Sequence, residues 1–445
     1  MKKNECPAKG GASRRSFLKN SLAAAGGAVA LPYLVPASAL GLDGTTAPSN
    51  RMVMGVIGTG GRGTHDLSWL LGEGDVQFVA VCDVQRAKRE RAKKLVDEKY
   101  GNADCAAFRD FRELLAKKPD IESVIIATGD RWHTPASILC MRAGKDVYCE
   151  KPGALTIAEG QALVAAEQAT KRIFQTGAQR TSETNFVFMG EAIRLGRLGK
   201  VHTARAHLGY LPQWPRVNAA LPEEPLPPQE DLDWDLWVGP SPMRPYHHDY
   251  LKPWPVPGWY TQYDFAGGIA QWGSHTILQC QHDLGLAATS ATEYEYSADL
   301  KKNGMTIRFA NGLTLVAQEQ GWHGSCGVRY EGDLGWIACA DGYERPEASS
   351  PELLRDFTQV IRDHADRTLT PRNHLRNFLQ CVRTREAPRT PATTAHRTMT
   401  TNLIMDICLD LKRNLRWDPV AEAFINDDEA NLLRSRKTRA PYIVL

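Results

Sequence analysis

Two stretches of the sequence carry side chains whose types and spacing could perform proton transfer. Glu150-Lys151-Pro152 follows a strand predicted at residues 145–149, and Gln271 and His275 stand four residues apart. That i, i+4 spacing places both side chains on one helical face, where they can point at the same ligand. Lysine and histidine exchange protons, whereas a glutamine amide only donates and accepts hydrogen bonds. The residue types therefore allow proton transfer by Lys151 and His275 alone.

A glycine-rich segment could hold the phosphates of a dinucleotide. The apolar strand predicted at Met52–Ile57 leads into Gly58-Thr-Gly60-Gly-Arg-Gly63 and then into a helical pattern. In this context Gly58 permits a tight turn, Gly60 lets the backbone approach a pyrophosphate, and Gly63 allows the helix to pack closely on the strand. The free N–H groups of the helix N-terminus would face the phosphates. The segment therefore predicts a nicotinamide dinucleotide site.

Asp83 bears on the choice between NAD and NADP. It ends the next predicted strand, residues 76–83, where a carboxylate can bind the adenosine ribose hydroxyls. A carboxylate there also repels the 2′-phosphate of NADP, so Asp83 favours NAD. Arg86, Lys88 and Arg89 follow closely enough for one to reach a phosphate, or they form the solvated face of a helix. NADP therefore stays an alternative.

Several longer motifs resemble a known family. A third strand at residues 121–128 is followed by a loop with Trp132 and His133, a helix and the segment "AGKDVYCEKP". Together with the glycine-rich start, these resemble the Gfo/Idh/MocA oxidoreductases, whose members transfer hydride between NAD(P) and a sugar or polyol. The segments "QTGAQR", "AIRLGRLGKV", "WDLWVGPSP", "GGIAQWGSH" and "HLRNFLQCVRTR" follow in the order of that family and look like its secreted bacterial branch.

The resemblance implies roles for individual residues. Lys151 would be the catalytic base, its pKa lowered by burial and by a cationic nicotinamide ring, and His275 would assist it. Many relatives carry Asp where this chain carries Gln271. The alternatives are a surface lysine and a structural histidine. The expected cofactor contacts are Gly58, Thr59, Gly60, Arg62, Gly63, Asp83, Thr128, His133, Glu150 and Lys151. The expected substrate contacts are Arg180, Trp259, Gln271 and His275.

The same patterns predict two folded domains. Residues 50–172 are expected to form an α/β Rossmann domain with a doubly wound parallel sheet. Residues 173–445 are expected to form an α+β domain with a mostly antiparallel sheet, including a hairpin around Asn311-Gly312. A helix within residues 396–415 has the apolar spacing of a core helix. The Pro/Glu-rich segment 218–235 is expected to be a long surface loop.

The first 45 residues are typical of a twin-arginine export signal. Arg14-Arg15 precedes a weakly apolar stretch at residues 22–34 and the small-residue site Ala37-Ser38-Ala39. The stretch is too short for a typical membrane anchor, so no stable insertion is expected after cleavage. A periplasmic or otherwise exported location follows from this interpretation. Because NAD is not freely available there, the cofactor should be tightly bound before export.

Amino-acid composition limits the kinds of partner that we expect. The chain has 54 Lys and Arg against 51 Asp and Glu, so it lacks the excess of positive charge that is typical of nucleic-acid-binding proteins. Ten cysteines without a C-x-x-C pair predict buried thiols rather than disulfides. No metal is expected at His247-His248-Asp249, because nothing nearby in the sequence completes a ligand set. Trp254, Trp259 and Tyr260 form either a platform for sugar rings or part of the core. The resemblance implies a homo-oligomer.

Three functions fit these observations. The first is an exported NAD(P)-dependent oxidoreductase acting on a sugar or polyol, with CH–OH as donor. The second is a glycoside hydrolase that oxidises a sugar hydroxyl transiently and then returns the hydride. The third is a sugar-binding relative without catalysis, which Gln271 in place of Asp would allow.

Overall fold

The computed structural model describes residues 46–209, 219–252, 258–318, 325–368 and 373–443. The predicted export signal and Trp254 lie outside these ranges. Residues 1–51 form one unit, of which the described part contains a short 3-10 helix, η2 (Pro48–Asn50). Residues 52–445 form a second unit, which carries both sheets.

A parallel sheet of six strands forms the first part of the larger unit, in the order β3-β2-β1-β4-β5-β6. The order reverses between β1 and β4, as in a doubly wound sheet, so the predicted fold class is confirmed. The last strand lies beyond residue 172. The strands are β1 (Met52–Ile57), β2 (Val76–Cys82), β3 (Ala106–Phe108), β4 (Ser123–Ile126), β5 (Asp146–Cys149) and β6 (Phe174–Thr176).

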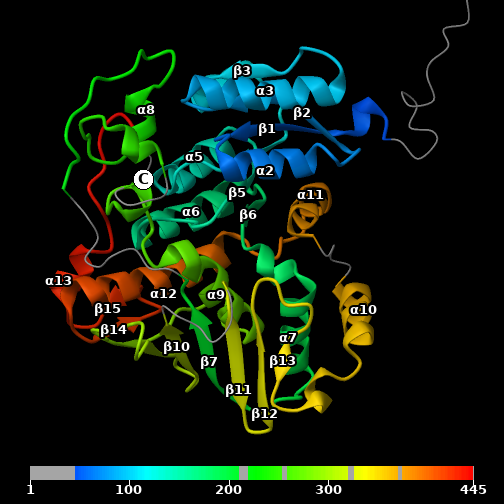
Figure 1. Cartoon of the computed structure of the whole chain (residues 1–445), viewed down its shortest axis with the longest axis vertical. Helices are drawn as coiled ribbons and strands as arrows, with labels where there is room; N and C mark the ends of the chain where they lie inside the picture. Colours follow the sequence, from blue (N-terminus) through cyan, green and yellow to red (C-terminus); the bar gives the residue numbers. More distant parts are fainter. Residues whose placement is uncertain (1–45, 210–218, 253–257, 319–324, 369–372, 444–445) are drawn as a thin grey trace, which may run out of the picture. The chain divides into compact units, whose positions relative to one another are not determined.

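Helices cover both faces of this sheet, because successive side chains of a strand point to opposite faces. Ile125 packs on one side with α2 (Gly61–Leu70), α3 (Arg86–Tyr100) and α11 (His374–Thr384). Val124 and Ile126 pack on the other side with α4 (Phe111–Lys117), α5 (Asp130–Arg142) and α6 (Ile157–Thr170). Figure 1 shows α11 beside the parallel sheet, although most strands of the second sheet precede α11 in the sequence. The first sheet is therefore completed by a late segment of the chain.

The second sheet has nine strands in the order β13-β12-β11-β7-β10-β9-β8-β14-β15. Its pairings are antiparallel except for β10 with β7, which confirms the predicted mostly antiparallel sheet. β9 and β10 flank the predicted Asn311-Gly312 turn. The strands are β7 (Val201–His207), β8 (Glu293–Glu295), β9 (Met305–Arg308), β10 (Thr314–Gln318), β11 (Val328–Gly332), β12 (Gly335–Cys339), β13 (Glu347–Ala348), β14 (Leu415–Asp418) and β15 (Ala423–Phe424).

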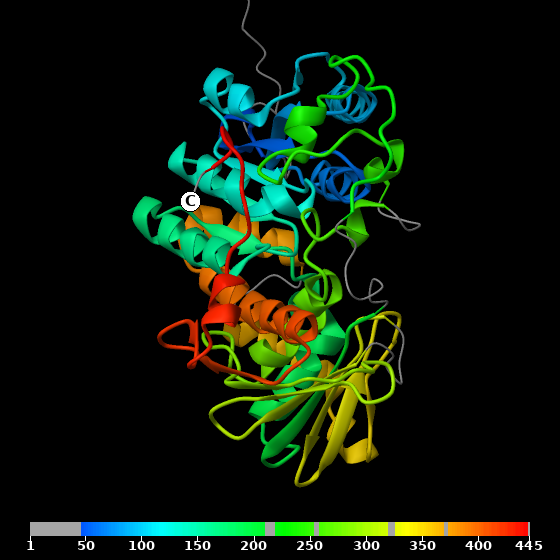
Figure 2. The same ribbon diagram turned by 90° about the vertical axis from the view of Figure 1, so that its left-hand side faces the viewer.

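One long helix packs against elements of both sheets. α12 (Ala392–Leu411) is the predicted core helix, and it packs against α6 of the parallel-sheet part and against α9 (Ala270–Asp283). Figure 2 shows α12 between the two sheets. The remaining elements are α7 (Thr184–Arg194), α8 (Trp234–Val238), α10 (Phe357–Thr368), α13 (Asp428–Leu432), η3 (Gln179–Ser182), η4 (His248–Leu251), η5 (Trp259–Thr261) and η6 (Pro351–Leu354).

The segment predicted as a surface loop is partly buried. The carbonyl of Asp231 accepts a hydrogen bond from the Arg86 N–H at 2.9 Å, and the Asp233 N–H donates to the Val84 carbonyl at 3.1 Å. Leu232 between them is buried. The segment therefore returns to the parallel sheet beside β2 and leads directly into α8.

Two further expectations concern the described residues. All nine cysteines there are buried free thiols, as predicted. None of the helices within the described ranges combines the length and apolar character needed to cross a bilayer.

Candidate functional site

The glycine-rich turn joins β1 to α2. Gly58 has a φ of +86°, and a Cβ placed there would lie 2.6 Å from the Ala127 carbonyl oxygen. A Cβ on Gly63 would lie 2.0 Å from the Gly58 carbonyl oxygen. Gly60 differs, because a Cβ there would meet no atom within 4 Å, and no side chain caps α2 at this residue. Packing therefore explains Gly58 and Gly63, whereas Gly60 leaves room for a ligand at a helix N-terminus.

A cavity of about 350 Å³ opens at this turn. Its lining includes six residues predicted from the sequence, Gly58, Gly60, Arg62, Asp83, Thr128 and Trp259. Leu236 and Trp237 of α8 also line it, and sequence reasoning missed both. The cavity wall is therefore built from both parts of the larger unit. Lys151, Gln271 and His275 lie outside this lining.

Asp83 is fixed at the cavity by backbone donors. One carboxylate oxygen accepts a hydrogen bond from the Thr59 N–H at 2.8 Å, and the other accepts from the Gln85 N–H at 2.9 Å. Oδ2 also accepts from the Thr59 hydroxyl at 3.3 Å. Because each oxygen has two lone pairs, Oδ1 keeps one for a further donor such as a ribose hydroxyl. The turn and the acidic residue are thus held together before any ligand binds.

The three basic residues after Asp83 have separate partners. Arg86 forms an ion pair with Asp231 at 3.3 Å, and Arg89 donates to the Asp83 carbonyl at 2.7 Å. Lys88 lines the cavity, and its burial lowers the pKa of its ammonium, against the opposing charge of Asp83. Of the three, Lys88 is therefore placed to meet a phosphate on the ribose.

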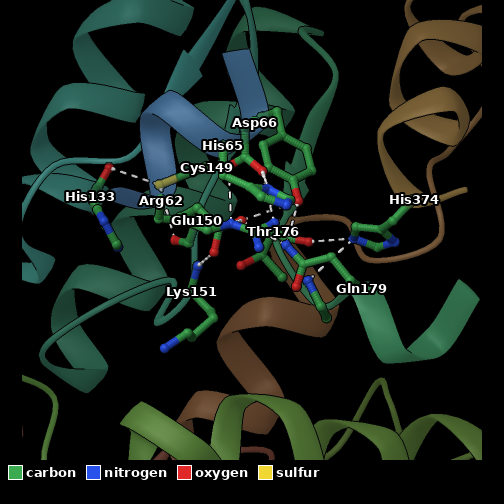
Figure 3. Close-up of polar contacts among 12 residues, drawn as sticks. Arg62, His65, Asp66, His133, Cys149, Glu150, Lys151, Thr176, Gln179 and His374 are labelled. Carbon is green, nitrogen blue, oxygen red and sulfur yellow. Dashed lines mark hydrogen bonds and ion pairs between the residues drawn. The ribbon is translucent and has the colours of Figure 1, made fainter. Parts of the chain in front are cut away.

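Glu150 lies in a buried polar cluster, drawn in Figure 3. Its Oε1 accepts from Arg62 Nε at 3.0 Å and from Gln179 Nε2 at 2.6 Å. Arg62 also pairs with Asp66 at 2.8 Å. Burial, together with the charge of Glu150, raises the pKa of the Asp66 carboxyl to about 8, although Arg62 opposes this. Glu150 therefore holds Arg62 at the edge of the cavity, and its predicted contact with the cofactor stays a prediction.

His133 lies in the first turn of α5 rather than in a loop, which corrects the expectation for Trp132 and His133. It is buried, with Nδ1 at 2.7 Å from the Pro152 carbonyl oxygen and Nε2 at 3.2 Å from the Thr128 carbonyl oxygen. His133 is absent from the cavity lining and joins the end of β4 to the residue after Lys151. Its predicted cofactor contact stays a prediction.

Lys151 extends away from the Glu150 cluster (Figure 3). Its Nζ donates to the Gln271 backbone carbonyl at 3.0 Å and to the Tyr260 hydroxyl at 3.5 Å. Burial favours a lower pKa for Lys151, but Tyr260, Asp130 and Glu150 outweigh burial and raise that pKa above its ordinary value. The expected lowering is therefore not found in the protein alone, because the sequence argument did not include these acidic neighbours.

Gln271 and His275 share one face of α9 near Lys151. The side-chain amide of Gln271 donates to Asp130 Oδ2, which also accepts from the Gly267 N–H at 2.9 Å. His275 is buried, and its Nδ1 has no hydrogen-bond partner among the described residues. Burial, followed by the charges of Arg180 and Lys151, holds the pKa of His275 well below its usual range. The structure therefore places a neutral imidazole, an amide and a lysine together.

Arg180 forms a two-point ion pair with Asp341, with Nε–Oδ1 at 2.9 Å and a terminal nitrogen at 2.6 Å from Oδ2. Its side chain is mostly buried. Arg180 thus serves a structural ion pair, and its predicted substrate contact stays a prediction.

Comparison with known families decides the classification. Residues 52–178 match the family model described as oxidoreductase family, NAD-binding Rossmann fold, and residues 206–444 match the model of its C-terminal alpha/beta domain. The chain belongs to the Gfo/Idh/MocA oxidoreductase family.

Individual relatives are more distant. Myo-inositol 2-dehydrogenase of Thermotoga maritima is 32% identical over 155 residues, which are 35% of this chain and 44% of that protein. A glycosyl hydrolase family 109 protein of Solibacter usitatus is 35% identical over 170 residues, 36% of this chain and 37% of that protein. The matches thus span less than half the length of either relative.

A solved structure supports the Gfo/Idh/MocA fold over most of the chain. The WlbA dehydrogenase of Chromobacterium violaceum, crystallised with NADH and UDP-GlcNAcA, has a TM-score of 0.58 and 17% identity. The superposition covers 84% of this chain and 98% of that structure.

A histidine pair outside the family motifs has a neighbour that sequence reasoning missed. Glu224 lies with a carboxylate oxygen 2.8 Å from His248 Nδ1 and 3.5 Å from His247 Nε2. The three side chains offer ligand atoms within 4.8 Å of one another. The Asp249 N–H, however, donates to His247 Nδ1 at 3.1 Å, so in the neutral ring Nε2 carries the proton rather than a free lone pair. These contacts account for the cluster without an ion.

Proposed function

We propose that this protein is an NAD-dependent oxidoreductase that transfers hydride between a hydroxyl-bearing carbon of a sugar or polyol and a nicotinamide cofactor. The observation that carries the proposal is the convergence of Lys151 and α9. The Nζ of Lys151 lies 3.0 Å from the Gln271 carbonyl, one helical turn before the neutral His275. Lys151 follows the carboxyl end of β5, which pairs with β4, and β4 leads into Thr128 and Gly129 of the cavity lining. A proton acceptor and a cofactor site are thus adjacent.

The described residues fit NAD. Gly60 leaves space at an uncapped helix N-terminus, and Asp83 keeps acceptor capacity at the cavity. Gly58, Gly60 and Asp83 would hold the pyrophosphate and the adenosine ribose, with Lys88 nearby. When bound, oxidised NAD supplies the hydride acceptor.

The remaining steps belong to the chain's own side chains. Lys151 in its neutral form accepts the proton of the substrate hydroxyl. Gln271 cannot exchange a proton, so it orients the substrate. His275, whose pKa is held well below its usual range, offers a neutral ring nitrogen as a hydrogen-bond acceptor rather than as a strong base. Trp259, in the cavity lining and in edge contact with Tyr260 at 4.8 Å between ring centroids, offers an apolar face to a sugar ring.

The test begins with protein purified without added cofactor. Mass spectrometry of the small molecules released on denaturation should detect NAD rather than NADP. Incubation with myo-inositol, a panel of aldoses and aryl glycosides should then produce a ketone product together with reduced cofactor. Absence of any bound or bindable nicotinamide, or of any turnover with the whole panel, would refute the proposal and favour a non-catalytic binding protein.

A second candidate is a redox-cycling glycoside hydrolase. The match to the family 109 glycosyl hydrolase of Solibacter usitatus favours it. In that case the aryl glycosides would release their aglycone with no net change in the nicotinamide. The same incubation therefore separates the two activities.

We further propose that the protein is exported with its cofactor already bound. Arg14-Arg15 ahead of a short Ala/Gly-rich stretch supports the twin-arginine route, and that route accepts folded proteins. An exported nicotinamide enzyme would have to retain its cofactor and regenerate it in place. A homo-oligomer is also proposed, and light scattering during size-exclusion chromatography tests it.

A further inference from the structure

We infer that Asp130 is the counter-charge of Lys151, a positioning residue that fixes Gln271 and stabilises the ammonium formed when Lys151 takes up a proton. The role of Asp130 in the reaction rests on the proposed function. The claim that Asp130 is the counter-charge of Lys151 rests on the geometry alone. Neither the glycine-rich motif nor the Glu150-Lys151-Pro152 motif contains Asp130.

Asp130 is placed by two parts of the chain. It is the first residue of α5 and is 3% exposed, so water screens its charge weakly. Its Oδ2 accepts from the Gly267 N–H at 2.9 Å and from the Gln271 amide, both of which precede or begin α9. A carboxyl oxygen has two lone pairs, so Oδ2 can accept both donors. Burial raises the pKa of the Asp130 carboxyl, and the neighbouring His133 and Lys151 and the hydrogen bond from Gly267 oppose this rise. Asp130 therefore joins the start of α5 to the start of α9.

Residue 271 is shared between Asp130 and Lys151. Its side-chain amide donates to Asp130, and its backbone carbonyl accepts from Lys151 Nζ at 3.0 Å. Because a carboxylate can only accept, the amide must turn its NH₂ group to Asp130, and its own carbonyl oxygen then stays available as an acceptor. The charge of Asp130 thus sets the orientation of the Gln271 side chain as well as the field at Lys151.

The other charges around this pair have their own partners. Arg131 donates to the Trp237 carbonyl at 2.7 Å and lies over the Trp237 ring at 3.9 Å. His133 bridges two backbone carbonyls. Glu150 is paired with Arg62, and Tyr260 contacts Lys151 through its hydroxyl. Among these groups, Asp130 and Lys151 are the anion and the cation that contact the same residue.

The reaction needs such a counter-charge. When the substrate O–H bond breaks, its proton forms a new N–H bond on Lys151, the oxygen's electron pair forms the carbonyl, and the C–H pair leaves as hydride to the bound nicotinamide. Lys151 changes from neutral to cationic in a site with little water. A buried ammonium without a nearby anion is strongly disfavoured, so a fixed carboxylate lowers the free energy of the proton-transferred state.

An exchange of side chains tests the inference. Asp130→Asn keeps the shape and an acceptor oxygen but removes the charge, and Gln271→Asp places a charge on the other side of the same contact. With [ε-¹³C]lysine-labelled protein and no substrate, NMR titration should show the pKa of Lys151 falling by about one unit or more in Asp130→Asn. It should rise in Gln271→Asp and return close to the parent value in the double variant. The Lys151 resonance is assigned by its absence in Lys151→Arg.

Asp283→Asn is the matched control. Asp283 accepts from the Gln279 amide at 2.8 Å on the same helix, so the variant also removes a carboxylate from a buried carboxylate–amide pair. It should leave the Lys151 titration unchanged. An unchanged titration in folded Asp130→Asn, or a double variant no closer to the parent than Asp130→Asn, would overturn the inference. If Asp130→Asn does not fold, Gln271→Asp decides alone, because an unshifted titration there contradicts a shared charge site.

Turnover separates this inference from the proposed function. If the parent oxidises a polyol, the acid limb of its kcat–pH profile should move to lower pH in Asp130→Asn and return in the double variant. If the parent oxidises nothing but the titration shifts as expected, the proposed function fails and the counter-charge stands. If the parent is active and neither the titration nor the profile moves, the counter-charge alone fails.

Discussion

The carboxylate of Asp83 accepts a hydrogen bond from the backbone N–H of Thr59 at 2.8 Å. Asp83 therefore has two separable properties, a shape that holds the glycine-rich turn and a charge at the cavity. The position and the charge both favour NAD over NADP. Substitutions that keep one property and remove the other show which of them selects the cofactor.

Asp83→Asn should retain an acceptor for the Thr59 N–H while losing the charge. We expect NAD to bind about tenfold more weakly, because hydrogen bonds to a charged acceptor contribute about 1.5–3 kcal/mol. The ratio of the NADP and NAD dissociation constants should move closer to one. Asp83→Ser should weaken NAD binding further, since the turn then loses the acceptor that supports it. Isothermal titration with both cofactors measures this. Equal NAD/NADP ratios in parent and Asp83→Asn would show that Lys88 or another residue decides.

Gly60→Ala and Gly63→Ala form a matched pair within the turn. A Cβ at Gly60 meets no protein atom, so the free energy of unfolding without cofactor should change by less than about 0.5 kcal/mol. NAD affinity should nevertheless fall, because the methyl group projects into the space for the ligand. Gly63→Ala should destabilise the protein by about 2 kcal/mol or more, since its Cβ would overlap the Gly58 carbonyl oxygen. Urea unfolding with and without NAD distinguishes the two effects, and equal behaviour of the two variants would contradict the assignment.

Lys151→Ala should reduce turnover by about 10² to 10⁴, the usual contribution of a general acid–base group. Cofactor binding should remain, because Lys151 lies outside the lining of the cavity. Single-turnover reduction of bound NAD, with the cofactor content measured in the same sample, tests both points. Turnover within a few-fold of the parent would move the assignment to His275 or to the non-catalytic alternative.

His374 should make the stability of the protein depend on pH. Burial is the main cause that lowers its pKa to about 3, against an ordinary value of 6.5, so the folded protein keeps it neutral. Between these values the unfolded chain binds the proton more readily, and stability therefore falls as the pH drops from about 6.5 to 3. At about 1.4 kcal/mol per pKa unit, the loss is on the order of 5 kcal/mol.

Replacement of that histidine isolates its contribution. His374→Gln should be less stable than the parent at pH 7, since the contact with the Thr176 carbonyl at 2.8 Å is altered. Its stability should then fall less steeply with acid. Urea unfolding at several pH values gives both curves, and parallel curves would rule out His374 as the source.

Export by the twin-arginine route predicts that Arg14→Lys combined with Arg15→Lys leaves the precursor in the cytoplasm. The precursor should still contain its cofactor there. Cell fractionation with immunoblotting measures the distribution, and normal export of the double variant would exclude this route.

Local patterns predicted much of the fold. The apolar run at Met52–Ile57 before Gly58, and the Asn311-Gly312 turn between β9 and β10, were sufficient because each signal lies within a few residues. The start of α5 was placed too late. A proline is typical of a first helical turn, and Pro135 lies inside this helix instead, after Trp132 and His133.

The parts of the site that sequence did not predict depend on contacts between distant residues. Asp130 appears in the sequence as a single acid at the start of a helix, and its partner Gln271 follows 141 positions later. Tyr260 is likewise recognised as part of the site only by its contact with Lys151, and Trp237 only by its place in the cavity lining. An acidic residue four positions after the end of β4 was the one signal that could have identified Asp130, since ligands bind at the carboxyl ends of parallel strands.

The position of α8 at the cavity has a consequence for the order of events during translation. The glycine-rich turn, Asp83 and Thr128 leave the ribosome well before Leu236 and Trp237, yet all of them line the same cavity. A nascent chain that ends before α8 contains all six strands of the parallel sheet, but it lacks α11 on one face of that sheet and one side of the cavity. Capture of the dinucleotide should therefore be late and should coincide with the return of α8 to β2. Arrested nascent chains that end before and after residue 238 would differ in whether they hold it.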